Sequence, residues 1–225
     1  MKFKSSGFTL VEVLIAVFIF GIIATTIFGS YHSVFSNAQE LNNRISDDEM
    51  GMGCLTRMTR DLSSAVISLP PQYRSPKLNA KPDPHRFLSQ NDLLAGLNFS
   101  SLRFTSLSHT PMDIRLPDRI SEIIYYIDQT GQDQYVLRRA DHPYPFFDQT
   151  KSKKDPILCE NIKSISFTYY DQDGKTYDRW DSESADFGYA TPKGIEIRLE
   201  IGEGDPPRVF ETGTGIPSWR MKTNR

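Results

Sequence analysis

The sequence predicts an α+β fold in which one long N-terminal helix packs on an antiparallel β-sheet domain. Three observations predict it. An apolar run occupies residues 8–28, and helical periodicity continues beyond that run as far as about residue 68. After a proline-rich stretch, the spacing of apolar residues changes from about 3.6 to about 2, the period of a strand. With 225 residues, the chain has room for one or two domains.

The apolar run at residues 8–28, FTLVEVLIAVFIFGIIATTIF, contains a single charge, at Glu12. As a helix it spans about 30 Å, the thickness of the hydrocarbon core of a bilayer. Lys2 and Lys4 precede it without any acidic residue, which predicts a cytoplasmic N-terminus and an outward-facing body. The run is longer than the apolar stretch of a secretory signal, and a small residue, Gly7, comes before it. A cut after Gly7 would leave the whole helix on the mature chain.

Glu12 is unusual because a carboxylate near the centre of a membrane helix costs about 2.5–3.5 kcal/mol on insertion scales. In one interpretation, Glu12 lies close enough to the headgroups and to the positive end of the helix dipole to be tolerated. In the other, it meets a cation at its own depth, the α-amino group of a chain cut before Phe8. That amine belongs to the same helix or to a staggered neighbour, and the second case predicts an intermolecular ion pair.

Residues 7–20, GFTLVEVLIAVFIF, resemble the class III signal of type IV pilins and type II secretion pseudopilins. In that signal a glycine is followed by phenylalanine and by glutamate at the fifth position of the mature chain. The resemblance implies a pilin-like fold, cleavage between Gly7 and Phe8 by prepilin peptidase, and N-methylation of Phe8. It also implies that Glu12 takes part in docking onto a neighbouring subunit. Many pilins carry proline where this chain has Gly29, so we expect at most a softened helix there.

The helix is expected to continue into the body, because apolar or neutral residues recur at three- or four-residue steps and their multiples. They are Leu41, Ile45, Met52, Leu55, Thr59, Leu62 and Val66. An acidic cluster, Asp47, Asp48 and Glu49, is expected on a solvated face of this helix. We therefore divide the chain into a cleaved leader (1–7), a transmembrane and assembly helix (8–29), an amphipathic helix (30–69), a connector (70–100) and a β-rich domain (101–225).

Six short segments are typical of strands in one antiparallel sheet. They are residues 101–106, 120–128, 134–139, 162–171, 193–201 and 208–212. Thr130-Gly131 predicts a hairpin, and so does the run Asp171-Gln172-Asp173-Gly174. That acidic run does not fit a calcium-binding EF-hand loop. Its glycine is at the fourth position instead of the sixth, and Ser182 replaces the bidentate glutamate at the twelfth. The aromatic loop at residues 142–147 is expected to pack structurally, with contact to a partner as the alternative.

Composition and motifs exclude several functions. Lys and Arg number 26 against 28 Asp and Glu, so there is no basic excess for nucleic acid. The sequence contains no nucleophile elbow, phosphate-binding loop or metal-ligand triad, which predicts no enzyme activity, no cofactor and no metal. Cys54 and Cys159 are expected to be buried free thiols, with a disulfide as the alternative if the body is extracytoplasmic.

Three segments of the body resemble minor pseudopilin J of the type II secretion system: RMTRDLSSAV (57–66), LCENIKSISFTYYDQDGK (158–175) and TPKGIEIRLEI (191–201). The resemblance implies a single-pass inner-membrane subunit with a periplasmic body. It also implies a pseudopilus tip complex with minor pseudopilins I and K, above a shaft of the major pseudopilin, that helps to export folded proteins across the outer membrane. One alternative is a minor pilin of a type IV pilus or competence system. The other is a membrane-anchored periplasmic binding protein whose helix is only a tether.

Overall fold

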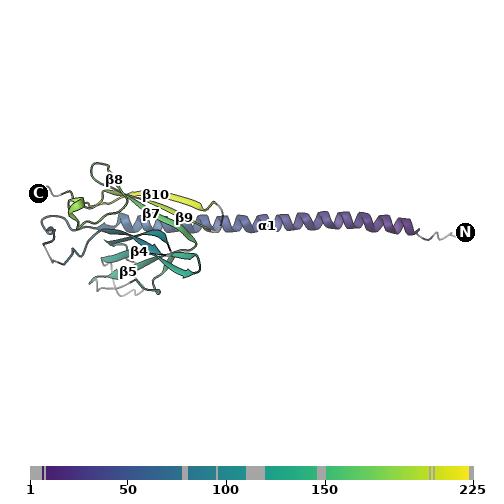
Figure 1. Cartoon of the computed structure of the whole chain (residues 1–225), viewed down its shortest axis with the longest axis horizontal. Coiled ribbons are helices and arrows are strands. Elements are labelled where there is room, and N and C mark those ends of the chain that lie inside the picture. Colours follow the sequence, from purple (N-terminus) through teal and green to yellow (C-terminus); the bar gives the residue numbers. More distant parts are fainter. Residues whose placement is uncertain are drawn as a thin grey trace. The chain divides into compact units, whose positions relative to one another are not determined.

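A single helix, α1 (Leu10–Ser63), accounts for the N-terminal quarter of the chain. The computed structural model describes residues 7, 9–77, 81–94, 96–109, 120–145, 151–202, 204 and 206–222. The chain divides into two compact units, residues 1–46 and 47–225, and α1 runs from the first unit into the second (Figure 1). The predicted long helix is confirmed, and it passes through Gly29 without a break.

In the first unit, the apolar side chains of α1 are exposed, from Leu10 (82%) to Phe35 (69%). The hydroxyl groups in this part bond to the helix's own carbonyl oxygens. Thr25 donates to the carbonyl of Gly21 at 3.0 Å, and Thr26 donates to that of Ile23 at 2.8 Å. Because these hydroxyls are satisfied within the helix, they do not prevent this segment from lying in lipid.

Helix α1 ends at Ser63, earlier than the predicted end near residue 68. Ala65 and Val66 form a short strand, β1 (Ala65–Val66), which pairs antiparallel with Ser106 and Thr105. The helix therefore ends early because these residues pair with β3 (Leu97–Ser106) as a strand.

The predicted apolar stripe of the helix is confirmed in part, because Leu55 and Leu62 are buried. Leu41, Ile45 and Met52, however, are 58%, 48% and 60% exposed, and the buried helix positions differ in part from the predicted ones. The buried positions are Gly51, Cys54, Leu55, Met58, Asp61 and Leu62. They follow the three- and four-residue steps of one helix face. The body covers this face, so contacts with the sheets decide the phase.

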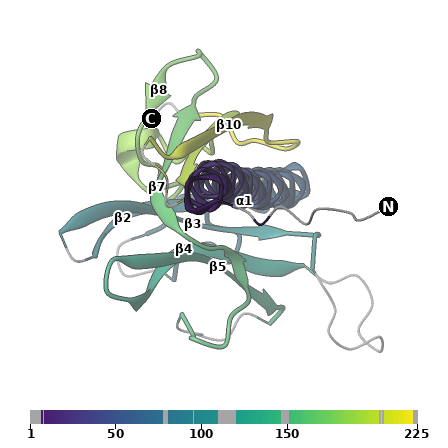
Figure 2. The same ribbon diagram turned by 90° about the vertical axis from the view of Figure 1, so that its right-hand side faces the viewer.

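Among the described residues, the strands form two antiparallel sheets instead of the one expected. In the first sheet the order is β1, β3 (Leu97–Ser106), β4 (Ser121–Gly131), β5 (Gln134–Pro143) and β6 (Ile157–Cys159), and β2 (Leu88–Leu94) also pairs with β3. In the second sheet the order is β10 (Arg208–Gly215), β9 (Gly194–Ile201), β7 (Ile162–Tyr170) and β8 (Thr176–Tyr177). Figure 2 shows β3, β4 and β5 in one layer and β7 with β10 in the other. A short 3-10 helix, η1 (Ala185–Phe187), precedes β9.

All six predicted strand segments are strands, but β1, β2, β6 and β8 were not predicted. Strand β2 and the start of β3 lie within residues 70–100, the stretch predicted to be a connector. Strand β2 reads LSQNDLL and lacks a clear apolar alternation. It forms because it pairs along its whole length with β3, from Leu88 opposite Arg103 to Leu94 opposite Leu97.

Both predicted hairpins are present, but the turn of the first lies at residues 132–133, because Thr130 and Gly131 end strand β4. Strands β4 and β5 meet at a turn in which Gly131 pairs with Gln134 and Asp133 has a φ of 53°. Strands β7 and β8 meet at the run from Asp171 to Gly174, where Gly174 has a φ of 80° that favours glycine.

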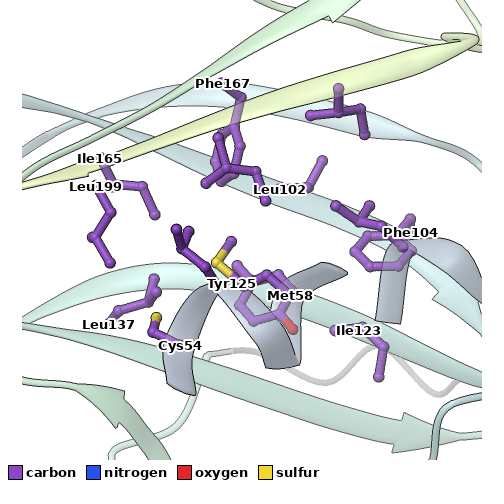
Figure 3. Close-up of a cluster of buried hydrophobic side chains, with 14 of the residues drawn as sticks. Cys54, Met58, Leu102, Phe104, Ile123, Tyr125, Leu137, Ile165, Phe167 and Leu199 are labelled. Atoms are coloured by element: carbon purple, nitrogen blue, oxygen red, sulfur yellow. The ribbon is translucent and has the colours of Figure 1, made fainter. Parts of the chain in front are cut away.

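The core of the body forms where helix and sheets meet. Figure 3 shows Met58 of α1 among side chains of both sheets, including Tyr125 and Leu137 from the first and Phe167 and Leu199 from the second. All five side chains are buried in one cluster. The last part of α1 is thus a core element, as predicted, and its packing fixes it to both sheets.

The C-terminal segment ties several loops together through Arg220. Its guanidinium donates to the carbonyls of Ser182 at 2.7 Å, Tyr189 at 2.6 Å and Ser68 at 3.0 Å. The same group stacks on the ring of Tyr73, 3.2 Å from its centroid. Because its side chain is only 2% exposed, Arg220 depends on these partners for the hydrogen bonds that water would otherwise supply.

Candidate assembly segment and its attachment to the body

The predicted processing site lies just before α1. Gly7 is exposed and outside the helix, whereas Phe8 falls outside the described residues. Glu12 lies in the first turn of α1 and is exposed. Cleavage after Gly7, methylation of Phe8 and docking through Glu12 stay predictions.

Thr9 and Glu12 form a capping box at the start of α1. The carboxylate Oε2 of Glu12 accepts the backbone N–H and the hydroxyl of Thr9, each at 2.9 Å. In return, the backbone N–H of Glu12 donates to the Thr9 hydroxyl oxygen at 3.3 Å. These reciprocal bonds satisfy donors that the first turn of any helix leaves unpaired.

The capping box is a role for Glu12 that the sequence reasoning missed. Its signal was present, because a threonine followed three residues later by glutamate, just before an apolar run, is the sequence signature of a capping box. Glu12 therefore has a local use as well as the predicted intermolecular one. The two uses are compatible, because a carboxylate has about four lone-pair sites and the box occupies only part of them.

In the part of the chain that the structure describes, α1 is the one helix that is long and apolar enough to cross a membrane. The apolar window is near the N-terminus, and none of it is buried by the protein. This helix supports a single-pass membrane anchor.

Cys54 and Cys159 form a disulfide, so the expectation of two free thiols is wrong. Their Cα atoms are 6.2 Å apart, within the usual range for a disulfide, although the residues are separated by 105 positions in sequence. Cys54 is on α1 and Cys159 ends β6. The bond therefore links the helix covalently to an edge of the first sheet.

A buried carboxylate, Asp61, forms a second link between α1 and the first sheet. It accepts Arg139 Nε of β5 at 2.6 Å and the Tyr125 hydroxyl of β4 at 2.5 Å, and Arg57 Nε lies 3.2 Å away. Burial raises the pKa of Tyr125 well above its ordinary value, and the charge of Asp61 raises it further. Burial lowers the pKa of Arg139, but the hydrogen bond and charge of Asp61 outweigh this and raise it. Tyr125 stays protonated and Arg139 stays charged.

A third link joins α1 to the second sheet. Asp48 accepts Arg208 Nη2 of β10 at 2.6 Å and Arg208 Nε at 3.0 Å. The solvated face expected for the acidic cluster is thus only part of its role, because Asp48 pairs with the body. Its side chain is 43% exposed, so this pair is worth less than the buried one at Asp61.

The acidic run that begins at Asp171 has a structural explanation. Asp171 Oδ1 accepts the backbone N–H groups of Asp173 and Lys175, both at 2.9 Å, and Oδ2 accepts Lys222 Nζ at 2.7 Å. No group of three or more His, Cys, Asp or Glu side chains suited to a metal occurs among the described positions.

In the aromatic loop, His142 is buried with its Nδ1 3.7 Å from Glu122, and residues 146 and 147 lie outside the described part.

A long N-terminal helix with an exposed apolar half, joined to an antiparallel β body, defines a pilin-like, membrane-anchored protein. Comparison with protein families identifies the family to which the chain belongs. The model described as "Type II secretion system (T2SS), protein J" matches residues 29–212, and that of the "Prokaryotic N-terminal methylation motif" matches residues 2–28. The chain belongs to the type II secretion system protein J family. A search of curated proteins finds no match.

Proposed function

We propose that this chain is a structural, non-enzymatic subunit of a pseudopilus tip complex that helps to export folded proteins across the outer membrane. The observation that carries the proposal is the family match over residues 29–212, preceded without a gap by the methylation motif at residues 2–28. Its partners are minor pseudopilins I and K and the major pseudopilin. The β body faces the periplasm, and residues 1–7 face the cytoplasm until they are removed.

In this proposal, prepilin peptidase cuts between Gly7 and Phe8, and Phe8 is then N-methylated. Residues 8–29 lie in inner-membrane lipid before assembly. The large apolar side chains from Leu10 to Phe28 are exposed within the chain, so they are available to pack against the helices of other subunits. Head-to-tail contacts of this kind build open helical arrays.

Glu12 supplies the charge that orients assembly. While the helix is alone in lipid, the capping box with Thr9 gives the carboxylate hydrogen-bond partners. In the assembly, the free capacity of the carboxylate accepts the methylated amine of Phe8 on a neighbouring subunit. Pairing neutralises two charges that would each be costly to leave alone in an apolar environment.

Substitutions at Glu12 and Thr9 separate the charge from the cap. Gln at position 12 preserves a capping box but lacks the negative charge, whereas Leu removes both. We expect Glu12→Gln and Glu12→Leu to abolish secretion and recovery in the tip complex, measured by complementation and by copurification. Thr9→Val, which keeps the charge, is the control and should remain near wild type. Full activity of Glu12→Gln would show that the cap alone matters and would overturn the charge pairing.

Two further measurements test the assembly role. Mass spectrometry of the mature chain should find N-methylated Phe8 at its amino terminus, and an uncut Met1 in cells with an active peptidase would refute processing. Exchanging residues 8–28 for an unrelated membrane helix should abolish function. Retained function would favour a tethered binding protein instead.

A further inference from the structure

Three of the attachments between α1 and the body follow one another along the helix. Asp48 forms an exposed ion pair with the second sheet, Cys54 a disulfide with the first sheet, and Asp61 a buried ion pair with the first sheet. A pull on the N-terminal end of α1 therefore reaches the weak exposed pair first, then the contacts of Met50 with Glu160 and of Gly51 with Phe210, and then the covalent attachment at Cys54.

The disulfide is enclosed by the folded body. Cys54 and Cys159 are each 1% exposed, and Cys159 lies opposite Leu137 of β5 in the register of the sheet. Soluble thiols cannot reach the sulfur atoms while β6 stays paired, because exchange requires a thiolate to attack a sulfur directly. Once closed, the bond persists for as long as the body is folded.

The position of the disulfide determines which part of the chain carries tension. Strands β1 to β6, the whole first sheet, lie between Cys54 and Cys159 in sequence, whereas the second sheet follows Cys159. Tension between α1 and the second sheet thus passes through the sulfur atoms from Cys54 to Cys159. The 105-residue loop between them is bypassed.

We propose that the Cys54–Cys159 disulfide is a mechanical latch, closed by oxidation outside the cytoplasm, that keeps α1 seated against the first sheet when the helix is pulled. The source of the pull, extraction of the apolar helix from lipid during assembly, rests on the proposed function. The latch itself rests on the placement of the two cysteines.

Closing the latch is a two-electron oxidation. One cysteine thiolate attacks a disulfide-form oxidant of the extracytoplasmic compartment and displaces one of its thiolates, which gives a mixed disulfide. The second cysteine, as thiolate, then attacks the mixed disulfide and releases the oxidant as a dithiol. The two cysteines lose two electrons and two protons, and the oxidant gains the electrons. Because the folded body encloses both sulfur atoms, this exchange takes place before β6 closes over them.

Single-molecule pulling on the full mature chain in detergent micelles tests the latch. Handles attached near residue 36 of α1 and at the C-terminus apply tension along the proposed route. In the oxidised wild type, complete extension should be shorter by about 350 Å than in Cys54→Ala/Cys159→Ala, because the loop stays closed at about 3.3–3.6 Å per residue. We also expect α1 to separate from the body at a clearly lower force in the double variant. Equal extension, or separation at equal force, would overturn the proposal.

A second measurement covers the case in which the double variant folds poorly. Wild-type chains in mild reductant should keep the disulfide at zero force, shown by resistance to a thiol-reactive polymer tag, and should react once the body is unfolded by denaturant. Tagging of the folded chain at the rate of the unfolded chain would contradict enclosure of the latch. Neither measurement uses the secretion machinery, so a failed latch leaves the Glu12 and Phe8 results, and the proposed function, unaffected.

Discussion

The ring of Phe210 on β10 occupies the space where a side chain at position 51 of α1 would begin. A Cβ added to Gly51 would lie 2.5 Å from Phe210 Cε2, closer than such atoms approach in proteins. The helix can therefore lie this close to the second sheet only because residue 51 has no side chain.

Replacing Gly51 by alanine should destabilise the body, although alanine is normally favoured over glycine inside a helix by about 1 kcal/mol. The added methyl group must displace the Phe210 ring, and overpacking of this kind costs about 1–3 kcal/mol. Denaturant unfolding of the full chain in detergent measures the effect. Gly53→Ala is the matched control, because nothing lies within 4 Å of its added Cβ, and it should stabilise the chain. If both variants gain stability, the close contact does not hold.

Removing the charge of Asp61 should be far more harmful than removing that of Asp48. Asp61→Asn removes the buried charge between Arg57 and Arg139 and leaves Arg139 with Asp141 as its carboxylate partner; breaking a buried pair costs about 3–5 kcal/mol. Asp48→Asn breaks an exposed pair and should cost less than about 1 kcal/mol. Thermal unfolding of both variants tests the difference, and similar losses would show that Asp61 is not an essential attachment.

The turn at Asp171 predicts that the stability of the body falls at acidic pH. Burial disfavours the carboxylate, but the hydrogen bonds from Lys222 and from the backbone N–H groups of Lys175 and Asp173 outweigh it. They lower the pKa of Asp171 from 3.8 to about 2. Because this pKa is lower in the folded than in the unfolded chain, its stabilising contribution is complete above about pH 4 and is lost as the pH falls towards 2.

Asp171→Asn should therefore flatten the loss of stability between pH 4 and pH 2, besides lowering the melting temperature at neutral pH. Circular dichroism melts at several pH values measure the slope. The control is Asp173→Asn, whose side chain is 70% exposed and which should keep the wild-type slope. An unchanged slope in Asp171→Asn would show that other carboxyl groups govern acid unfolding.

Arg220→Lys should loosen the loops that meet at the C-terminal segment, even though the charge is conserved. Lysine lacks the planar, forked guanidinium that stacks on Tyr73 and donates to Ser182, Tyr189 and Ser68 together. Limited proteolysis should cut this variant faster than wild type, and the melting temperature should fall. Lys222→Arg, which preserves the pairing with Asp171, serves as the control; equal cutting rates in all three chains would contradict the role of Arg220.

Much of the fold could be predicted because local patterns and tertiary contacts agree. The apolar run at residues 8–28 and the alternation in residues 194–201 each specify one secondary structure. Turn residues such as Gly174 require a particular backbone conformation. The methylation motif is contiguous, so its residues are recognisable without knowledge of the fold.

The features of the fold and of the site that could not be predicted depend on contacts between residues far apart in the sequence. Met52 is exposed and Met58 is fully buried, yet both fit an apolar helix position, and only the sheets decide between them. Asp61 is charged, and nothing in its local sequence indicates that it is buried against Arg139, 78 residues later. Likewise, no spacing rule predicts that Cys54 would meet Cys159. The capping box at Thr9 was different, because its local signal was present and was overlooked.

The enclosure of the first sheet between two joined cysteines also affects how the protein would survive damage. A protease that cleaved the backbone between β1 and β2 would produce two polypeptides still joined through sulfur. The nicked body would migrate as one species until a reducing agent and a denaturant were applied together. The subunit would thus keep its membrane helix connected to its second sheet after a cut that would separate them in a chain without the disulfide.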